Sequence, residues 1–305
     1  MTFTGRGLYA SSSKEPRGRR SGWLFIGAVV GVVALIVAAA SVLSSFSTNH
    51  AERVDSFDGA ARVVIQNRTN GDVEITGTSG DQVVVGREAR ESPVTEVAER
   101  VGMEGDEVRA TANCDGWQMF GGCAVDYSVE VPEGVEVVVE SETGDVEVEG
   151  VAANITVTAG TGEVELSGVE GDLDLRTTTG EISAEGRGEV VRATSTTGDI
   201  DLEDFTATTA EVRATTGNID APGGFTTLTV AATTGEVHVG TASPFERISV
   251  QTTTGDVMVQ VPAGEYDVIG DSGTGDRDIH VRVDRNAEQV IDASTSTGSV
   301  TVETD

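Results

Sequence analysis

The chain has 305 residues, a formal net charge of −31 and 4% aromatic residues, against 38 glycines and 6 prolines. So acidic a chain repels nucleic acids and anionic lipid surfaces, which disfavours a function in binding either of them. The low aromatic content also disfavours an ordinary globular enzyme, and together with many Gly, Val and Thr residues it favours thin, repetitive β-structure.

The N-terminal segment predicts a membrane anchor. Residues 1–21 form a basic tail, and residues 22–46 are an uncharged, mostly apolar run, long enough to cross a hydrocarbon core of about 30 Å as one signal-anchor helix. Positive charge before this helix predicts a single-pass plasma-membrane protein with a cytoplasmic N-terminus. A linker at residues 47–56 then leads to a domain outside the membrane. The alternative is a cleaved signal peptide, since residues 38–40 are all alanine.

Residues 57–134 predict a strand-rich cap that covers the end of the repeats that follow. Strand-like alternation in the cap covers residues 61–66, 72–76, 82–86, 108–112 and 125–131. One short helix is predicted over residues 92–100, where Ser92 can cap the helix, Pro93 suits the first helical position, and Val94 and Val97 follow at helical spacing.

The cap also contains both cysteines of the chain, Cys114 and Cys123. In an oxidising compartment we expect them to form a disulfide that closes a small loop. A metal site would need two further ligands, and the three histidines are scattered along the chain. Trp117 and Phe120 lie in this loop and are candidate contact residues for a partner; the alternative is that they pack over the end of the repeats.

From residue 135 to 305 the chain repeats a Thr-Gly pair every 18 to 23 residues, which predicts a stack of similar units. Apolar residues alternate on both sides of each pair, so each repeat holds two short strands and the Thr-Gly pair is the turn between them. The predicted turn residues are Thr143-Gly144, Thr161-Gly162, Thr179-Gly180, Thr197-Gly198, Thr216-Gly217, Thr234-Gly235 and Thr254-Gly255, followed by Thr274-Gly275 and Thr297-Gly298.

Two details of the repeat can be predicted from its register. Counting alternate positions places the threonine before each glycine on the apolar face, which favours an internal threonine ladder, with a corner position as the alternative. Gly275 departs from the pattern because Arg277 stands where the other repeats have an apolar residue, and we expect a bulge or loosened turn there.

A row of acidic residues follows the turn glycines and would be stacked about 4.8 Å apart. Its members include Asp145, Glu163, Glu181, Asp199, Glu236 and Asp256. These side chains either splay into solvent or bind Ca²⁺ or Mg²⁺ weakly as a cation ladder, which would relieve their mutual repulsion. The sequence names no defined metal site and no other cofactor.

The Thr-Gly-Asp/Glu-Val repeats, the Val-Pro-x-Gly entry at residues 131–134 and the strand-rich cap together resemble the bacterial "putative adhesin" solenoid family over residues 57–304. The resemblance implies a role in the cell envelope and supplies no catalytic residues. The fold class expected is all-β: a single-stranded β-solenoid of 18–20-residue rungs with an N-terminal cap, preceded by one transmembrane helix.

Two functions follow as hypotheses. One is a non-catalytic interaction module that contacts a wall polymer or an envelope protein, with no nucleic-acid partner. The other is an accessory ectodomain of an envelope stress-sensing system, which would need a partner kinase because the cytoplasmic tail has only about twenty residues.

Overall fold

The computed structural model describes residues 50–90, 95–116 and 123–304. The chain divides into two compact units, Met1–Ser47 and Thr48–Asp305, and every described residue belongs to the second. The secondary structure of the described residues is all β, and they include no helix that is long and apolar enough to cross a membrane. The predicted membrane helix at residues 22–46 lies outside the described residues.

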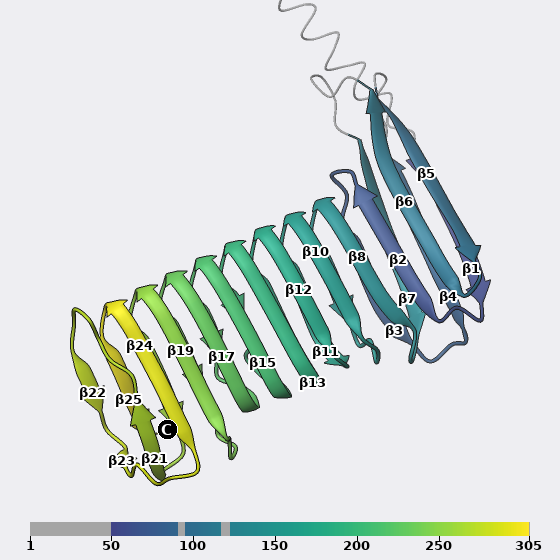
Figure 1. Cartoon of the computed structure of the whole chain (residues 1–305). Helices are drawn as coiled ribbons and strands as arrows, with labels where there is room; N and C mark the ends of the chain where they lie inside the picture. The colour runs from purple at the N-terminus through teal and green to yellow at the C-terminus, as the bar shows by residue number, and fades with distance from the viewer. Residues whose placement is uncertain (1–49, 91–94, 117–122, 305) are drawn as a thin grey trace, which may run out of the picture. The chain divides into compact units, whose positions relative to one another are not determined.

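The second unit is solenoid-like, with strands stacked in two facing layers (Figure 1). In spatial order, the first layer contains β5 (Thr95–Glu104), β6 (Glu107–Gly116), β2 (Arg62–Arg68), β8 (Glu136–Thr143), β10 (Ile155–Thr161), β12 (Leu173–Thr179), the end of β13 (Ile182–Thr197), β15 (Phe205–Thr216), β17 (Gly224–Thr234), β19 (Arg247–Thr254), β24 (Val290–Thr297), β21 (Glu265–Ile269) and β23 (Arg282–Val283).

The second layer contains the other strand of each rung. In spatial order these are β1 (His50–Asp58), β4 (Gln82–Arg90), β7 (Ala124–Pro132), β3 (Val73–Thr78), β9 (Val146–Glu149), β11 (Val164–Glu170), the start of β13, β14 (Ile200–Asp201), β16 (Ile219–Ala221), β18 (Val237–Gly240), β20 (Val257–Val261), β25 (Val300–Thr304) and β22 (Arg277–Ile279).

Neighbouring rungs pair in parallel, with equivalent positions of the repeat aligned. Val137 aligns with Ile155, and Ile155 with Leu173, so identical parts of the 18-residue repeat lie side by side. These side chains point between the two layers and are at most 1% exposed. Alternation of apolar and polar residues therefore fills one continuous core with Val, Ile, Leu and Ala, as the sequence predicts.

The rungs at the N-terminal end do not follow chain order. The β2–β3 rung lies between the β8–β9 rung that starts the repeats and the β6–β7 rung, although β6 and β7 come between them in sequence. Beyond β6–β7, the antiparallel strands β5, β4 and β1 extend the two layers. The order of the cap rungs in space therefore differs from their order in the chain.

The rungs at the C-terminal end are also out of chain order. The last strands of the chain, β24 and β25, insert between the β19–β20 rung and the earlier strands β21 and β22. The turn glycines stack in the order Gly255, Gly298, Gly275. The expectation of a bulge or loosened turn at Gly275 is therefore wrong: the irregular spacing reflects a change in rung order.

Two other expectations in the N-terminal part are also wrong. The predicted helix over residues 92–100 is replaced by strand β5 from Thr95 onward, which pairs with β6 along its whole length. The predicted linker over residues 47–56 contains the start of β1, which begins at His50 and pairs with β4.

Candidate functional site

The Thr-Gly pairs lie at the corners between the two layers, where glycine is required for a steric reason. Gly198 has φ 141°, and a Cβ atom added to it would lie 2.0 Å from the carbonyl oxygen of Gly180 in the preceding rung. Its N–H donates to the carbonyl oxygen of Thr216 in the next rung at 3.0 Å. The glycine thus permits close stacking of the corners as well as the turn itself.

The threonines of these pairs are not internal. Thr179, Thr197 and Thr216 are exposed, so the predicted internal threonine ladder is wrong and the alternative, a corner position, is confirmed. The inward row lies two residues earlier and contains Ser141, Ala159, Thr177, Ser195, Ala214, Ala232, Thr252 and Thr295. Parity fails because the regular ladder is interrupted one residue before the threonine: Thr177 and Thr179 pair with the neighbouring rungs, whereas the position between them does not.

The acidic row is partly explained by backbone hydrogen bonding between rungs. Oδ1 of Asp145 accepts the N–H of Glu163 at 2.8 Å, and Oδ1 of Asp199 accepts the N–H of Asn218 at 2.6 Å. Oδ1 of Asp256 accepts the N–H of Ser299 at 2.7 Å. These short side chains satisfy backbone groups at the corners, as Asp and Asn do in turns.

The longer members of the row differ. Glu163, Glu181 and Glu236 are exposed. Partial burial raises the pKa of Glu181, and the neighbouring carboxylates of Glu163, Asp199 and Asp201 raise it further. In the described part of the chain, no group of three or more His, Cys, Asp or Glu side chains is placed to hold a metal ion.

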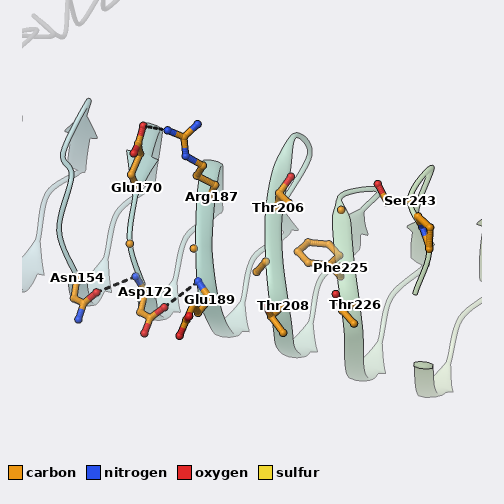
Figure 2. Close-up of a pocket in the computed structure, with 15 residues that line it drawn as sticks. Asn154, Glu170, Asp172, Arg187, Glu189, Thr206, Thr208, Phe225, Thr226 and Ser243 are labelled. Carbon is orange, nitrogen blue, oxygen red and sulfur yellow. Dashed lines mark hydrogen bonds and ion pairs between the residues drawn. The ribbon is translucent and has the colours of Figure 1, made fainter. Parts of the chain in front are cut away.

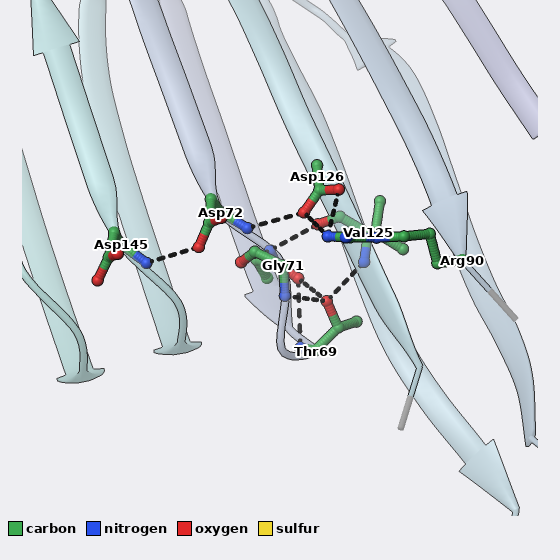
Figure 3. Close-up of polar contacts among 8 residues, drawn as sticks. Thr69, Gly71, Asp72, Arg90, Val125, Asp126 and Asp145 are labelled. Carbon is green, nitrogen blue, oxygen red and sulfur yellow. Dashed lines mark hydrogen bonds and ion pairs between the residues drawn. The ribbon is translucent and has the colours of Figure 1, made fainter. Parts of the chain in front are cut away.

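A buried hydrogen-bond network joins the β2–β3 corner to β7 within the cap (Figure 3). Asn67, which is fully buried, donates through Nδ2 to the carbonyl oxygens of Gly71 at 2.8 Å and Val125 at 2.9 Å. Its Oδ1 accepts the hydroxyl of Thr69 at 2.7 Å, and that hydroxyl oxygen accepts the N–H of Val125 at 2.9 Å. Asn67 pairs with Ser141, so it belongs to the inward row.

This network lies beside the disulfide, which the structure forms between Cys114 and Cys123. Val125 follows Cys123 by two residues, so the network anchors the end of the cysteine loop to the β2–β3 corner. The candidate contact residues Trp117 and Phe120 lie outside the described residues.

The cap interior holds a charged cluster that the sequence reasoning missed. The side chain of Arg87 is 10% exposed and lies 2.6 Å from Asp55 and 3.1 Å from Glu99, which is 11% exposed. Burial raises the pKa of the neighbouring Tyr127, an effect that Glu99 strengthens and Arg87 opposes. The signal was present in the sequence, because Arg87 continues the inward alternation of Val83 and Val85.

A groove of about 710 Å³ crosses several rungs on the side of the solenoid away from the Thr-Gly corners (Figure 2). It forms where β13, β15 and β17 continue around the second bend. Gly171, Gly188 and Gly224 line it and contribute no side chains, while Ala207 and the almost fully buried Phe225 lie in its floor.

Two rows of polar side chains border this groove (Figure 2). One row has Glu170, Arg187, Thr206 and Ser243, and the other has Asn154, Asp172, Glu189, Thr208 and Thr226. Glu170 forms an ion pair with Arg187, and Oδ1 of Asp172 accepts the backbone N–H groups of Glu189 at 3.1 Å and Val190 at 2.9 Å. The groove is therefore charged at one end and hydroxyl-lined at the other.

Comparison with known proteins identifies the fold and the family. No curated protein matches the chain. Two solved structures from Parabacteroides distasonis ATCC 8503 are similar: a putative adhesin with 12% identity and a TM-score of 0.52, and a putative lipid binding protein with 13% identity and a TM-score of 0.53. Each similarity covers 84% of this chain and 98% of the other. The model of the Toastrack DUF4097 family matches residues 60–303, and the chain therefore belongs to that family.

Proposed function

We propose that this chain is a non-catalytic interaction module, held outside the plasma membrane by residues 22–46, and that it contacts an envelope polymer or protein through the groove at the second bend. The observation that carries this proposal is the groove itself. It crosses several rungs and offers hydrogen-bonding groups in two parallel rows, a form that suits an extended ligand better than a compact one.

The charge of the groove restricts the chemical class of ligand that it can bind. Its lining includes three carboxylates, those of Glu170, Asp172 and Glu189, and one guanidinium, that of Arg187. An anionic polymer rich in phosphate would be repelled by this lining and by a chain of net charge −31. A neutral or amine-bearing extended ligand is favoured.

A lipid-binding role, the description of one structural neighbour, has less support. The large apolar side chains exposed in the described residues are Val54, Met258, Ile269 and Val283, which belong to four different strands. Val54 on β1 lies at one end of the stack, and Ile269 and Val283 on the paired strands β21 and β23 lie at the other. These four side chains therefore do not form one contiguous apolar patch of the kind that lipid-binding surfaces present.

The experiment is capture from envelope extracts by the full chain, solubilised in detergent and immobilised through an N-terminal tag. Thr208→Arg places a long cation in the groove and should abolish capture. Thr215→Arg is the matched control, because Thr215 is also exposed and lies on the same strand, β15, near the Thr-Gly corner. Equal capture by the parent and both variants would refute the groove as the binding surface.

A further inference from the structure

The inserted C-terminal rung is tied to the solenoid by a relay of side chains on its outer surface. The relay consists of Asp220 on β16, His238 on β18, Gln260 on β20 and Glu303 on β25, four strands that are consecutive neighbours in the second layer. Its last member belongs to the strand that is inserted out of chain order. The relay therefore links the inserted strand β25 to the rungs that precede it in space.

Three hydrogen bonds form the relay. His238 Nδ1 lies 3.0 Å from Asp220 Oδ1, and His238 Nε2 lies 3.0 Å from Gln260 Oε1. Gln260 Nε2 donates to Glu303 Oε1 at 3.0 Å. The step from β18 to β20 runs diagonally, and Gly240, which pairs with Gln260, has no side chain in the way.

The carboxylates of Asp220 and Glu303 at the two ends of the relay determine how many N–H groups the His238 ring must supply. An ionised carboxylate only accepts hydrogen bonds, so Glu303 requires the amide nitrogen of Gln260 and leaves its carbonyl oxygen to His238. Asp220 requires a donor at the other ring nitrogen for the same reason. All three hydrogen bonds therefore form together only when both nitrogens of His238 carry hydrogen, as they do in an imidazolium.

A neutral ring would break the relay at one of two places. It has a single N–H, so either Asp220 or Gln260 Oε1 would face a ring lone pair. Rotating the amide of Gln260 would not help, because its oxygen would then face the carboxylate of Glu303.

The charged groups around His238 are carboxylates. Asp220 faces the ring from β16 and Glu303 faces it through Gln260 from β25, while Asp201 on β14 pairs with Asp220. Glu236 and Asp256 lie at the corners before β18 and β20. A protonated ring offsets part of the repulsion among these groups.

We propose that Asp220, His238, Gln260 and Glu303 form a proton-dependent latch that holds the inserted β24–β25 rung more tightly at mildly acidic pH than at alkaline pH. Histidine is the side chain that changes charge across this pH range. The four residues lie in the part of the chain that is proposed to face the outside of the membrane. The proposal does not depend on the groove or on its ligand.

The test is hydrogen–deuterium exchange of the full chain in detergent, followed by mass spectrometry on peptides covering β25, at pH 5.5 and pH 8.0 and corrected for intrinsic exchange rates. In the parent, protection of β25 should be about threefold higher at pH 5.5, the size expected for a partly exposed charged contact. His238→Gln should remove this difference, because glutamine cannot be protonated in this range.

Glu303→Gln provides the second variant. A glutamine at 303 can donate as well as accept, so Gln260 is free to rotate and a neutral His238 can complete the relay. This variant should keep β25 protected and lose the pH dependence. A β25 pH difference that persists in His238→Gln, or that is absent from the parent, would overturn the proposal.

Discussion

At the residue scale, the corner glycines are the positions where one added carbon costs most. Gly198→Ala would place a Cβ atom 2.0 Å from the carbonyl oxygen of Gly180 and impose a left-handed backbone on alanine. We expect a loss of about 3 kcal/mol or more in the free energy of unfolding, measured by urea denaturation. Gly150→Ala is the control, because Gly150 also has a positive φ, 64°, but no atom lies within 4 Å of its added Cβ. It should lose only about 1 kcal/mol, and equal losses would contradict the stacking argument.

The acidic row gives a second prediction at this scale. Because the folded state raises the pKa of Glu181, the folded chain binds its proton more readily than the unfolded chain. Stability therefore falls as pH rises from the ordinary glutamate pKa through the raised one, and the full penalty remains above both. Glu181→Gln should raise the melting temperature at pH 7, with the gain disappearing below about pH 4. Glu133→Gln, at an exposed turn outside the row, should show no such gain. A Glu181→Gln gain independent of pH would contradict the assignment.

At the scale of the strand, the inward row contains both hydroxyl groups that form a hydrogen bond and hydroxyl groups that do not. The hydroxyls of Ser141, Thr177 and Ser195 are buried without a hydrogen-bond partner, whereas Thr295 donates to the carbonyl oxygen of Gly255 at 3.0 Å. Alanine already fills this row at three rungs. Ser195→Ala should therefore be neutral or stabilising by up to about 1 kcal/mol, and Thr295→Val should cost about 1 kcal/mol, both measured by thermal unfolding. A destabilised Ser195→Ala variant would show that its hydroxyl has a partner in solution.

The alternation of apolar residues was enough to predict most strands and the core. It gave a wrong prediction, a helix over residues 92–100, where a charged side chain faces inward. Val97 and Val101 are four apart, which favours a helix, because Glu99 between them interrupts the strand alternation. In the structure Glu99 faces inward and pairs with Arg87 on β4. A buried ion pair formed by strands distant in sequence cannot be read from either strand alone. The groove was missed for a related reason: it arises from glycines in several rungs, each of which looks like an ordinary turn residue.

At the scale of the whole second unit, the order of the rungs could not be predicted from the sequence. The rungs are similar, so equivalent positions can align whichever rung lies next to which. At both ends the structure chooses an order that differs from the chain. The only trace in the sequence is the uneven spacing of the last glycines, Gly255, Gly275 and Gly298.

This topology predicts that two deletions of similar size have different effects. Removing residues 164–181 takes out one internal repeat and joins equivalent positions, so the neighbouring rungs can pair again and the end strands stay in place. Removing residues 285–305 takes away the inserted β24 and β25, so β22 loses its paired strand and β21 keeps only its short pairing with β23. The end strands are poorly placed to close this gap. Tyr266 stacks on Phe245 and donates its hydroxyl to the carbonyl oxygen of Pro262 at 2.6 Å, but these side-chain contacts replace none of the strand pairing that β24 provides.

Hydrogen exchange over residues 265–279 measures the difference. We expect protection of these residues to remain in the internal deletion and to fall to the level of an exposed loop in the C-terminal deletion. The rungs formed by residues 137–163 and 182–202 should stay protected in both variants, because stability in a stacked fold is transmitted mainly between neighbours. Protected end strands in the C-terminal deletion would mean that they pair directly with β19 and β20. The inserted rung would then be a dispensable layer, and the uneven glycine spacing would have no structural consequence.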